Sequence, residues 1–186
     1  MIAAGFRVKS GFAIAVTLEG PASAPRVLSR RMVAMSDPKV PETRQPYHDG
    51  FYHTEENPRE IARRVKIVER CAKQSVAELL DDTHVARAGL VVGSVIDPRK
   101  VGNPHIRAHA HEGQLFRTVL EEALRSRGVR CQVIVEKQLA ARTAAGLQRP
   151  AREIKQTLDR FGKALGSPWR ADEKAAATAA WLALTS

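Results

Sequence analysis

The sequence has little cysteine and no long apolar run. Its two cysteines, Cys71 and Cys131, are too few and too far apart for a disulfide framework or a cysteine-based zinc module, and they indicate free thiols in a reducing compartment. No apolar run approaches the roughly 20 residues of a membrane-spanning helix, and the N-terminus has no secretory signal pattern. We therefore expect a cytoplasmic protein without a membrane partner. Phosphate-binding P-loops and serine-hydrolase elbows are also missing.

Acidic residues are scarce relative to basic ones. Thirty Lys and Arg stand against twenty Asp and Glu, which leaves a formal charge of +10 and a pI near 10.2. This balance favours a polyanionic partner such as nucleic acid, because neutralising phosphates releases counterions. An Arg-rich and Ala-rich proteome would produce the same balance without any such partner, so both interpretations stay open. The apolar fraction of 44 % is sufficient for one packed domain over residues 1–186.

The N-terminal third has the pattern of three consecutive strands. The stretch "GFRVKSGFAIAV", from Gly5 to Val16, predicts a strand, a tight turn and a second strand, and "PRVLSRRMVAM" predicts a third. Together they indicate an antiparallel meander. Residues 36–58 follow with four prolines and no apolar period, which predicts a long loop.

Helices and strands alternate in the rest of the chain. Residues 57–82 have helical periodicity, with Asn57 as N-cap and Pro58 at the first helical position. Residues 88–96 predict a buried strand, residues 112–128 a helix, and "RCQVIVE" a further buried strand before Ala-rich C-terminal helices. This order predicts an α/β fold with a mixed five-stranded sheet and helices on both faces.

The order of elements resembles the RNase H-like superfamily. The segments "VEKQLAARTAAGL", "PAREIKQTLDRFGKAL" and "SPWRADEKAAATAAWLAL" look like the end of Holliday-junction resolvases, and "GFRVKSGFAIAV" looks like their first hairpin. The resemblance implies carboxylates on the first strand, the central parallel strand and the last helix, which would hold two Mg²⁺ ions for phosphodiester hydrolysis.

The acidic positions that the resemblance implies are only partly present. The first-strand position falls on Arg7, whose guanidinium stays protonated and cannot bind a metal. The central position falls near Gly93 or Ser94, and the nearest acid, Asp97, comes after the strand. The last-helix position falls on Asp172 and Glu173, which are therefore the candidate catalytic acids. A two-metal nuclease of the ordinary kind is disfavoured.

Positive and aromatic side chains suggest direct contact with an anion. The candidate residues for binding a phosphate or a nucleic-acid backbone are Arg7, Lys9, Ser10, Arg99, Lys100 and Arg107. In the loop over residues 36–58, Tyr47, Phe51 and Tyr52 could stack on bases. The alternative is that these aromatic residues fold back and anchor the loop.

The string "HAHE" suggests a metal site. If this segment is extended, His109 and His111 point the same way and can share a transition metal, with Glu112 as a further ligand or a general base. The interpretation would be strengthened if His48 or His53 came within ligand range. In the alternative, these are ordinary side chains of a solvated loop.

Three functions remain open. The first is a nucleic-acid-associated protein with degenerate catalytic acids. The second is a metal-dependent nuclease with a rebuilt site, which would use Mg²⁺ or Mn²⁺ or a transition metal at the histidines. The third is a non-catalytic assembly module. A homodimer is compatible with the small-residue stripe on the last helix (Ala175, Thr178, Ala179 and Leu182).

Overall fold

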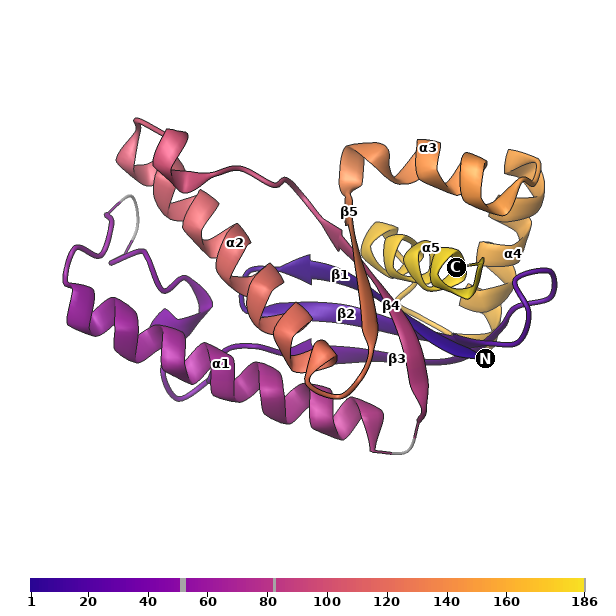
Figure 1. Ribbon diagram of the computed structural model, residues 1–186, viewed down its shortest axis with the longest axis horizontal. Helices are drawn as coiled ribbons and strands as arrows, with labels where there is room; N and C mark the ends of the chain where they lie inside the picture. Colours follow the sequence, from indigo (N-terminus) through magenta and orange to yellow (C-terminus); the bar gives the residue numbers. More distant parts are fainter. Residues whose placement is uncertain (51–52, 82, 186) are drawn as a thin grey trace.

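A five-stranded mixed sheet forms the centre of the protein (Figure 1). The computed structural model describes residues 1–50, 53–81 and 83–185. The strand order across the sheet is β3-β2-β1-β4-β5. The strands are β1 (Ile2–Lys9), β2 (Phe12–Glu19), β3 (Arg26–Ala34), β4 (Val85–Val92) and β5 (Arg130–Val135).

The pairing of the strands confirms the predicted meander and crossovers. Strands β1, β2 and β3 pair antiparallel, and Lys9 lies opposite Phe12 across the first turn. Strand β4 pairs parallel with β1, placing Arg7 beside Val91, and β5 pairs parallel with β4. The carboxyl ends of β1, β3, β4 and β5 therefore meet at one edge of the sheet, which we call the carboxyl edge.

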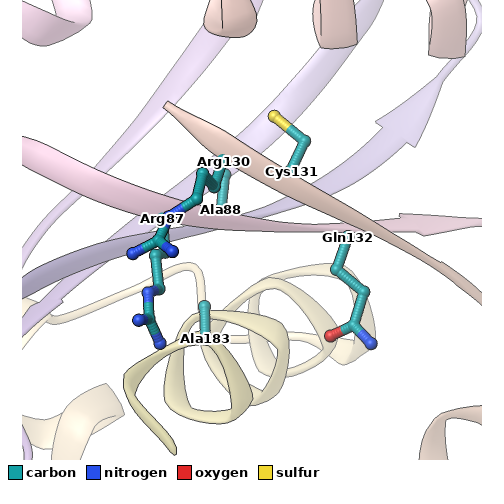
Figure 2. A pocket seen from close by; sticks show the side chains of 6 residues that line it. All are labelled: Arg87, Ala88, Arg130, Cys131, Gln132 and Ala183. Atoms are coloured by element: carbon teal, nitrogen blue, oxygen red, sulfur yellow. The ribbon is translucent and has the colours of Figure 1, made fainter. Parts of the chain in front are cut away.

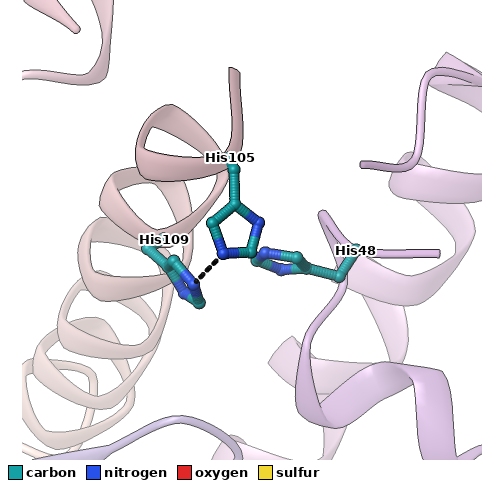
Figure 3. Close-up of side chains that lie close together, drawn as sticks. All are labelled: His48, His105 and His109. Atoms are coloured by element: carbon teal, nitrogen blue, oxygen red, sulfur yellow. Dashed lines mark hydrogen bonds between the residues drawn. The ribbon is translucent and has the colours of Figure 1, made fainter. Parts of the chain in front are cut away.

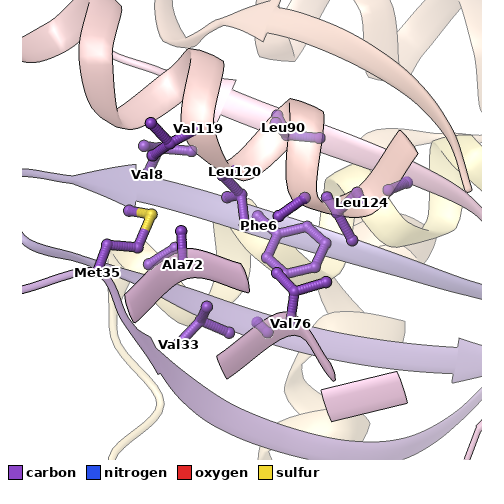
Figure 4. Close-up of a cluster of buried hydrophobic side chains, with 14 of the residues drawn as sticks. Phe6, Val8, Val33, Met35, Ala72, Val76, Leu90, Val119, Leu120 and Leu124 are labelled. Carbon is purple, nitrogen blue, oxygen red and sulfur yellow. The ribbon is translucent and has the colours of Figure 1, made fainter. Parts of the chain in front are cut away.

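Helices cover both faces of the sheet, as predicted (Figure 1). Helices α1 (Pro58–Leu80) and α2 (Pro104–Arg125) pack on one face, and Phe6, Leu90 and Leu120 lie in the core between them and the sheet (Figure 4). Helices α3 (Glu136–Leu147), α4 (Ala151–Leu165) and α5 (Ala171–Thr185) form the second core with the opposite face. In the part of the chain that the structure describes, every helix is too short or too polar to cross a membrane.

The N-terminal halves of α1 and α2 project beyond the carboxyl edge (Figure 1). The loop after β3 accompanies them; it contains the short 3₁₀ helix η1 (Pro41–Arg44) and a β-bridge between His48 and Thr54. As predicted, Asn57 caps α1 by accepting a hydrogen bond from the backbone N–H of Arg59. We call this part, residues 36–50 and 53–57 with the 3₁₀ helix η2 (Pro98–Lys100) and the first turns of both helices, the projecting end.

The prediction for the start of α2 was wrong. The helix begins at Pro104, not near residue 112, so the "HAHE" string is helical and not extended. The Asn103 side chain accepts a hydrogen bond from the backbone N–H of Ile106, and Pro104 occupies the first turn. These are strong helix-start signals, and they outweigh the polar composition that suggested a loop.

Helix α5 packs directly on the backbone of β1 and β4. A Cβ added to Gly5 would lie 1.9 Å from the carbonyl oxygen of Ala176, and one added to Gly89 would lie 2.7 Å from that of Ala179. Only glycine permits such an approach. The small residues of α5 thus serve helix–sheet packing: Thr178, Ala179 and Leu182 are buried within the chain and do not form an exposed dimer face.

We expect the substitution Gly5→Ala to destabilise the fold by at least about 3 kcal/mol, because the added methyl group must push α5 away from the sheet. Gly113→Ala is the matched control, since a Cβ at this α2 position meets nothing within 4 Å. It should stabilise the protein by about 1 kcal/mol through helix propensity. Denaturant unfolding measures both values, and equal effects would contradict the close approach.

Candidate functional site

A buried arginine lies at the centre of the carboxyl edge. The Arg7 side chain is 8 % exposed, and its Nη2 donates to Oε2 of Glu136 at 2.6 Å. Its Nε lies 3.4 Å from Oδ1 of Asp172. Glu136 begins α3 directly after β5, whereas Asp172 lies in the first turn of α5. Three elements therefore bring a cation and two carboxylates together.

Lys9 adds a second cation to this group. Its Nζ lies 3.4 Å from Oδ2 and 3.5 Å from Oδ1 of Asp172. The Asp172 carboxylate thus stands between a guanidinium and an ammonium group. We call Arg7, Lys9, Glu136 and Asp172 the ion-pair cluster; its two positive and two negative charges balance one another.

An open hollow of about 250 Å³ adjoins the ion-pair cluster. It lies between the first hairpin, the end of β4 and the middle of α2. Its lining supplies both cations of the cluster and small polar groups at the strand ends, which is a suitable environment for an anionic ligand. The lining residues are Arg7, Val8, Lys9, Ser10, Val92, Gly93, Ser94, Gly113 and Phe116.

The residues at this edge do not fit the two Mg²⁺ ions that the resemblance to resolvases implies. Mg²⁺ is bound through oxygen ligands, usually one or two carboxylates with water and phosphate. Here the first-strand position is Arg7, and Asp172 is already paired with two cations. Asp97, the first acid after β4 in the sequence, accepts hydrogen bonds from Nε and Nη2 of Arg99 at 3.0 Å each, and these hydrogen bonds lower the pKa of its carboxyl.

The two candidate catalytic acids have different surroundings. Asp172 belongs to the ion-pair cluster, but Glu173 is 6 % exposed and its Oε2 accepts the backbone N–H of Arg170 at 2.8 Å. That bond satisfies the N-terminus of α5, which is an ordinary structural role. Glu136 was missed as a site residue, because nothing in the sequence links it to Arg7 across 129 positions.

The other basic residues that were predicted to bind phosphate do not line this hollow. Arg99 and Lys100 lie in the 3₁₀ helix η2 (Pro98–Lys100), and Arg107 lies in the first turn of α2. Arg99 is engaged with Asp97, and Arg107 donates to the carbonyl oxygen of Val101 at 3.4 Å. All three are exposed at the projecting end, so they extend the basic surface instead of closing a single pocket.

Of the three aromatic residues predicted to stack on bases, Tyr47 is the one that the structure describes; Phe51 and Tyr52 lie outside the described residues. Tyr47 stacks on His111 with ring centroids 4.8 Å apart. Burial, and secondarily the negative charge of Glu112, raise the pKa of the Tyr47 hydroxyl. The ring therefore anchors the loop onto α2, as in the alternative interpretation.

The predicted grouping of histidines changes because the segment is helical. Two residues apart on a helix, His109 and His111 do not share a face. His105 and His48 lie beside His109 instead, and Glu112 is buried and contacts His48. The sequence signal for this arrangement is the i,i+4 spacing of His105 and His109, which is meaningful only once the helix start at Pro104 is recognised.

A second hollow, of about 370 Å³, lies at the opposite edge of the sheet (Figure 2). It is built around the neighbouring residues Arg87 of β4 and Arg130 of β5. Among the described residues, Nε and Nη1 of Arg87 are buried without a hydrogen-bond partner. The hollow is lined by Arg87, Ala88, Arg130, Cys131, Gln132 and Ala183. It is separate from the carboxyl edge.

Comparison with known proteins rests on structure alone. No protein-family model matches the chain, and no curated protein matches its sequence. Two structures of Thermus thermophilus RuvC are similar, each with a TM-score of 0.58. One is 13 % identical over 98 % of this chain and 92 % of RuvC; the other, in complex with a Holliday junction substrate, is 14 % identical over 98 % and 91 %. The yeast mitochondrial Holliday junction resolvase is 8 % identical over 98 % of this chain and 78 % of its own, with a TM-score of 0.49.

The similarity to RuvC covers nearly the whole of both chains, so it includes the sheet and the helices on both faces. The predicted resemblance is confirmed at the level of the fold. The chain has the RNase H-like fold of the Holliday-junction resolvases.

Proposed function

We propose that this protein binds nucleic acid at the carboxyl edge of its sheet and does not cleave it by the two-metal route. One observation carries the proposal: the Arg7 guanidinium lies between Glu136 and Asp172, at the edge where the resemblance to resolvases implies metal-binding carboxylates. A cationic side chain supplied by the protein itself takes over the neutralisation of these carboxylates. Anion binding then depends on the part-exposed Lys9 and the basic residues around the edge, and the edge loses its means of activating water.

The unfavourable free energy of displacing Arg7 supports the proposal that this edge does not bind a metal ion. A divalent ion at Asp172 would be repelled by the adjacent guanidinium and ammonium groups. Moving Arg7 away would leave its buried charge without a partner, which is strongly unfavourable. A rebuilt nuclease that uses Asp172 with Glu173 is less well supported, because the Glu173 carboxylate caps its own helix.

The distribution of charge supports nucleic acid as the ligand. The chain carries a formal charge of +10, and the hollow beside the ion-pair cluster presents Lys9 and Ser10 next to the strand ends. Arg99, Lys100 and Arg107 add exposed positive charge at the projecting end. The similar RuvC structure in complex with a Holliday junction favours a branched DNA as the first ligand to test. Cytoplasmic location and homodimer formation remain predictions from the sequence.

The first prediction concerns cleavage. We expect the purified chain to leave four-way junctions, duplexes and single strands uncut in Mg²⁺ or Mn²⁺, because Arg7 and Lys9 neutralise Asp172. Denaturing gels of end-labelled DNA measure this outcome. Cleavage that disappears in Asp172→Asn but persists in the control Asp81→Asn, an exposed residue at the C-terminal end of α1, would contradict the proposal.

The second prediction concerns salt. Binding to a four-way junction should weaken linearly in a plot of log Kd against log salt concentration, because each contacted phosphate releases counterions. Lys9→Gln should weaken binding and reduce the slope by about 1, the value for one lost phosphate contact. Fluorescence anisotropy at several KCl concentrations measures both quantities.

The matched control is Arg127→Gln, which removes the same charge from an exposed residue in the turn between α2 and β5, at the opposite edge of the sheet. This variant should bind like the wild type. A wild-type affinity that does not change with salt would exclude nucleic-acid binding and favour an assembly module. Equal losses in the two variants would mean that the carboxyl edge is not the binding surface.

A further inference from the structure

Three histidines converge where the loop after β3 meets α2 (Figure 3). His48 comes from the loop, whereas His105 and His109 lie one turn apart on the same face of α2. One ring nitrogen from each residue lies within 4.8 Å of those of the other two. Nε2 of His105 and Nε2 of His109 are 3.2 Å apart. Two imidazole nitrogens bound to one tetrahedral zinc ion, at about 2.0–2.1 Å each, would be separated by roughly 3.3 Å.

A buried carboxylate orients two of the three rings. Glu112 is 1 % exposed; its Oε1 lies 2.6 Å from Nδ1 of His48, and its Oε2 lies 3.5 Å from Nδ1 of His109. In the tautomer in which His48 donates from Nδ1 to the Glu112 carboxylate, the Nε2 lone pair is available. Carboxylates hold metal-binding histidines in this way.

Among the described residues, none forms a hydrogen bond with Nε2 of His48. The residue is 6 % exposed, and its Nε2 is buried without a hydrogen-bond partner among residues 1–50, 53–81 and 83–185. A buried nitrogen without a partner is unfavourable. Binding of a cation at the meeting point of the rings would satisfy it and would also offset the negative charge of Glu112.

Among the described residues of the projecting end, none belongs to the two apolar cores that stabilise the rest of the molecule. In α1, the core residues Val68, Ala72 and Val76 lie in the C-terminal part, where the helix covers the sheet. At the other end the helix contacts are polar: Arg64 donates to the carbonyl oxygen of His48 at 2.9 Å and pairs with Glu55 at 2.7 Å. A metal ion that links the loop to α2 would supply the cohesion that apolar packing supplies elsewhere.

We propose that His48, His105 and His109 form a binding site for a zinc-class divalent cation, with Glu112 as the residue that positions His48 and His109. Imidazole ligands select zinc and its transition-metal neighbours over Mg²⁺. The site is therefore chemically different from the two-metal site that the fold implies. The His109 side chain is 49 % exposed, so a fourth coordination position is open to water. The proposal does not depend on nucleic-acid binding.

Titration of the chelator-treated full-length chain with Co²⁺ tests the proposal, because tetrahedral Co²⁺ has intense visible absorption. We expect one Co²⁺ per chain, displacement by Zn²⁺, no displacement by excess Mg²⁺, and a higher thermal unfolding temperature with Zn²⁺. His105→Ala should abolish the absorption. The matched control His111→Ala, on the same helix but stacked on Tyr47, should keep it.

The Glu112→Gln variant tests the positioning role. It should still bind one Co²⁺, but roughly 10- to 100-fold more weakly, as expected when the group orienting a metal ligand is altered. Circular dichroism before titration establishes whether each variant is folded. If His105→Ala is not folded, His109→Ala removes a second metal-binding residue, which is exposed and can be replaced without disturbing a core. Wild-type protein without a one-to-one spectrum, or folded His105→Ala or His109→Ala that binds like the wild type, would overturn the proposal.

Discussion

The direct contact of α5 with the backbone of β1 and β4 is the constraint on which the carboxyl edge depends. Because Gly5 and Gly89 have no side chains, the helix lies against the sheet with its Ala176 and Ala179 carbonyls in the space that Cβ atoms would fill. This approach holds the middle of the helix against the sheet. As a result, Asp172 in its first turn comes within 3.4 Å of Arg7. A displacement of α5 would therefore disturb both the second core and the ion-pair cluster.

The ion-pair cluster is the feature on which our proposal of altered chemistry rests. An edge where several strands end beside a helix N-terminus gathers polar groups whatever their charge. With carboxylates alone it attracts metal ions; with Arg7 and Lys9 among them, its negative charge is balanced internally. Fold and function are thus separable here, and the similarity to RuvC informs the first more than the second.

The carboxyl edge and the histidine site each contain a buried charged side chain, and the groups that offset this charge differ between the two. At the edge, the buried Arg7 is offset by the carboxylates of Glu136 and Asp172. At the projecting end, the buried Glu112 faces imidazoles that can carry a proton or bind a metal. A buried charge needs a partner in both places, and the kind of partner determines the chemistry that each place can support.

The sequence by itself determined the meander, the order of helices and strands and the absence of an acid at Arg7, because apolar periodicity and residue identity are local properties. It also indicated the α1 cap at Asn57. It did not predict the partnership of Arg7 with Glu136, or that of His48 with Glu112 across 64 positions. The start of α2, which was predicted wrongly, did have a local signal in Asn103 and Pro104. Only with this helix start does the spacing of His105 and His109 place both residues on one face of a helix. Only the tertiary structure decided which side chains meet, because long-range contacts follow from the packing of helices on the sheet and leave no pattern in neighbouring residues.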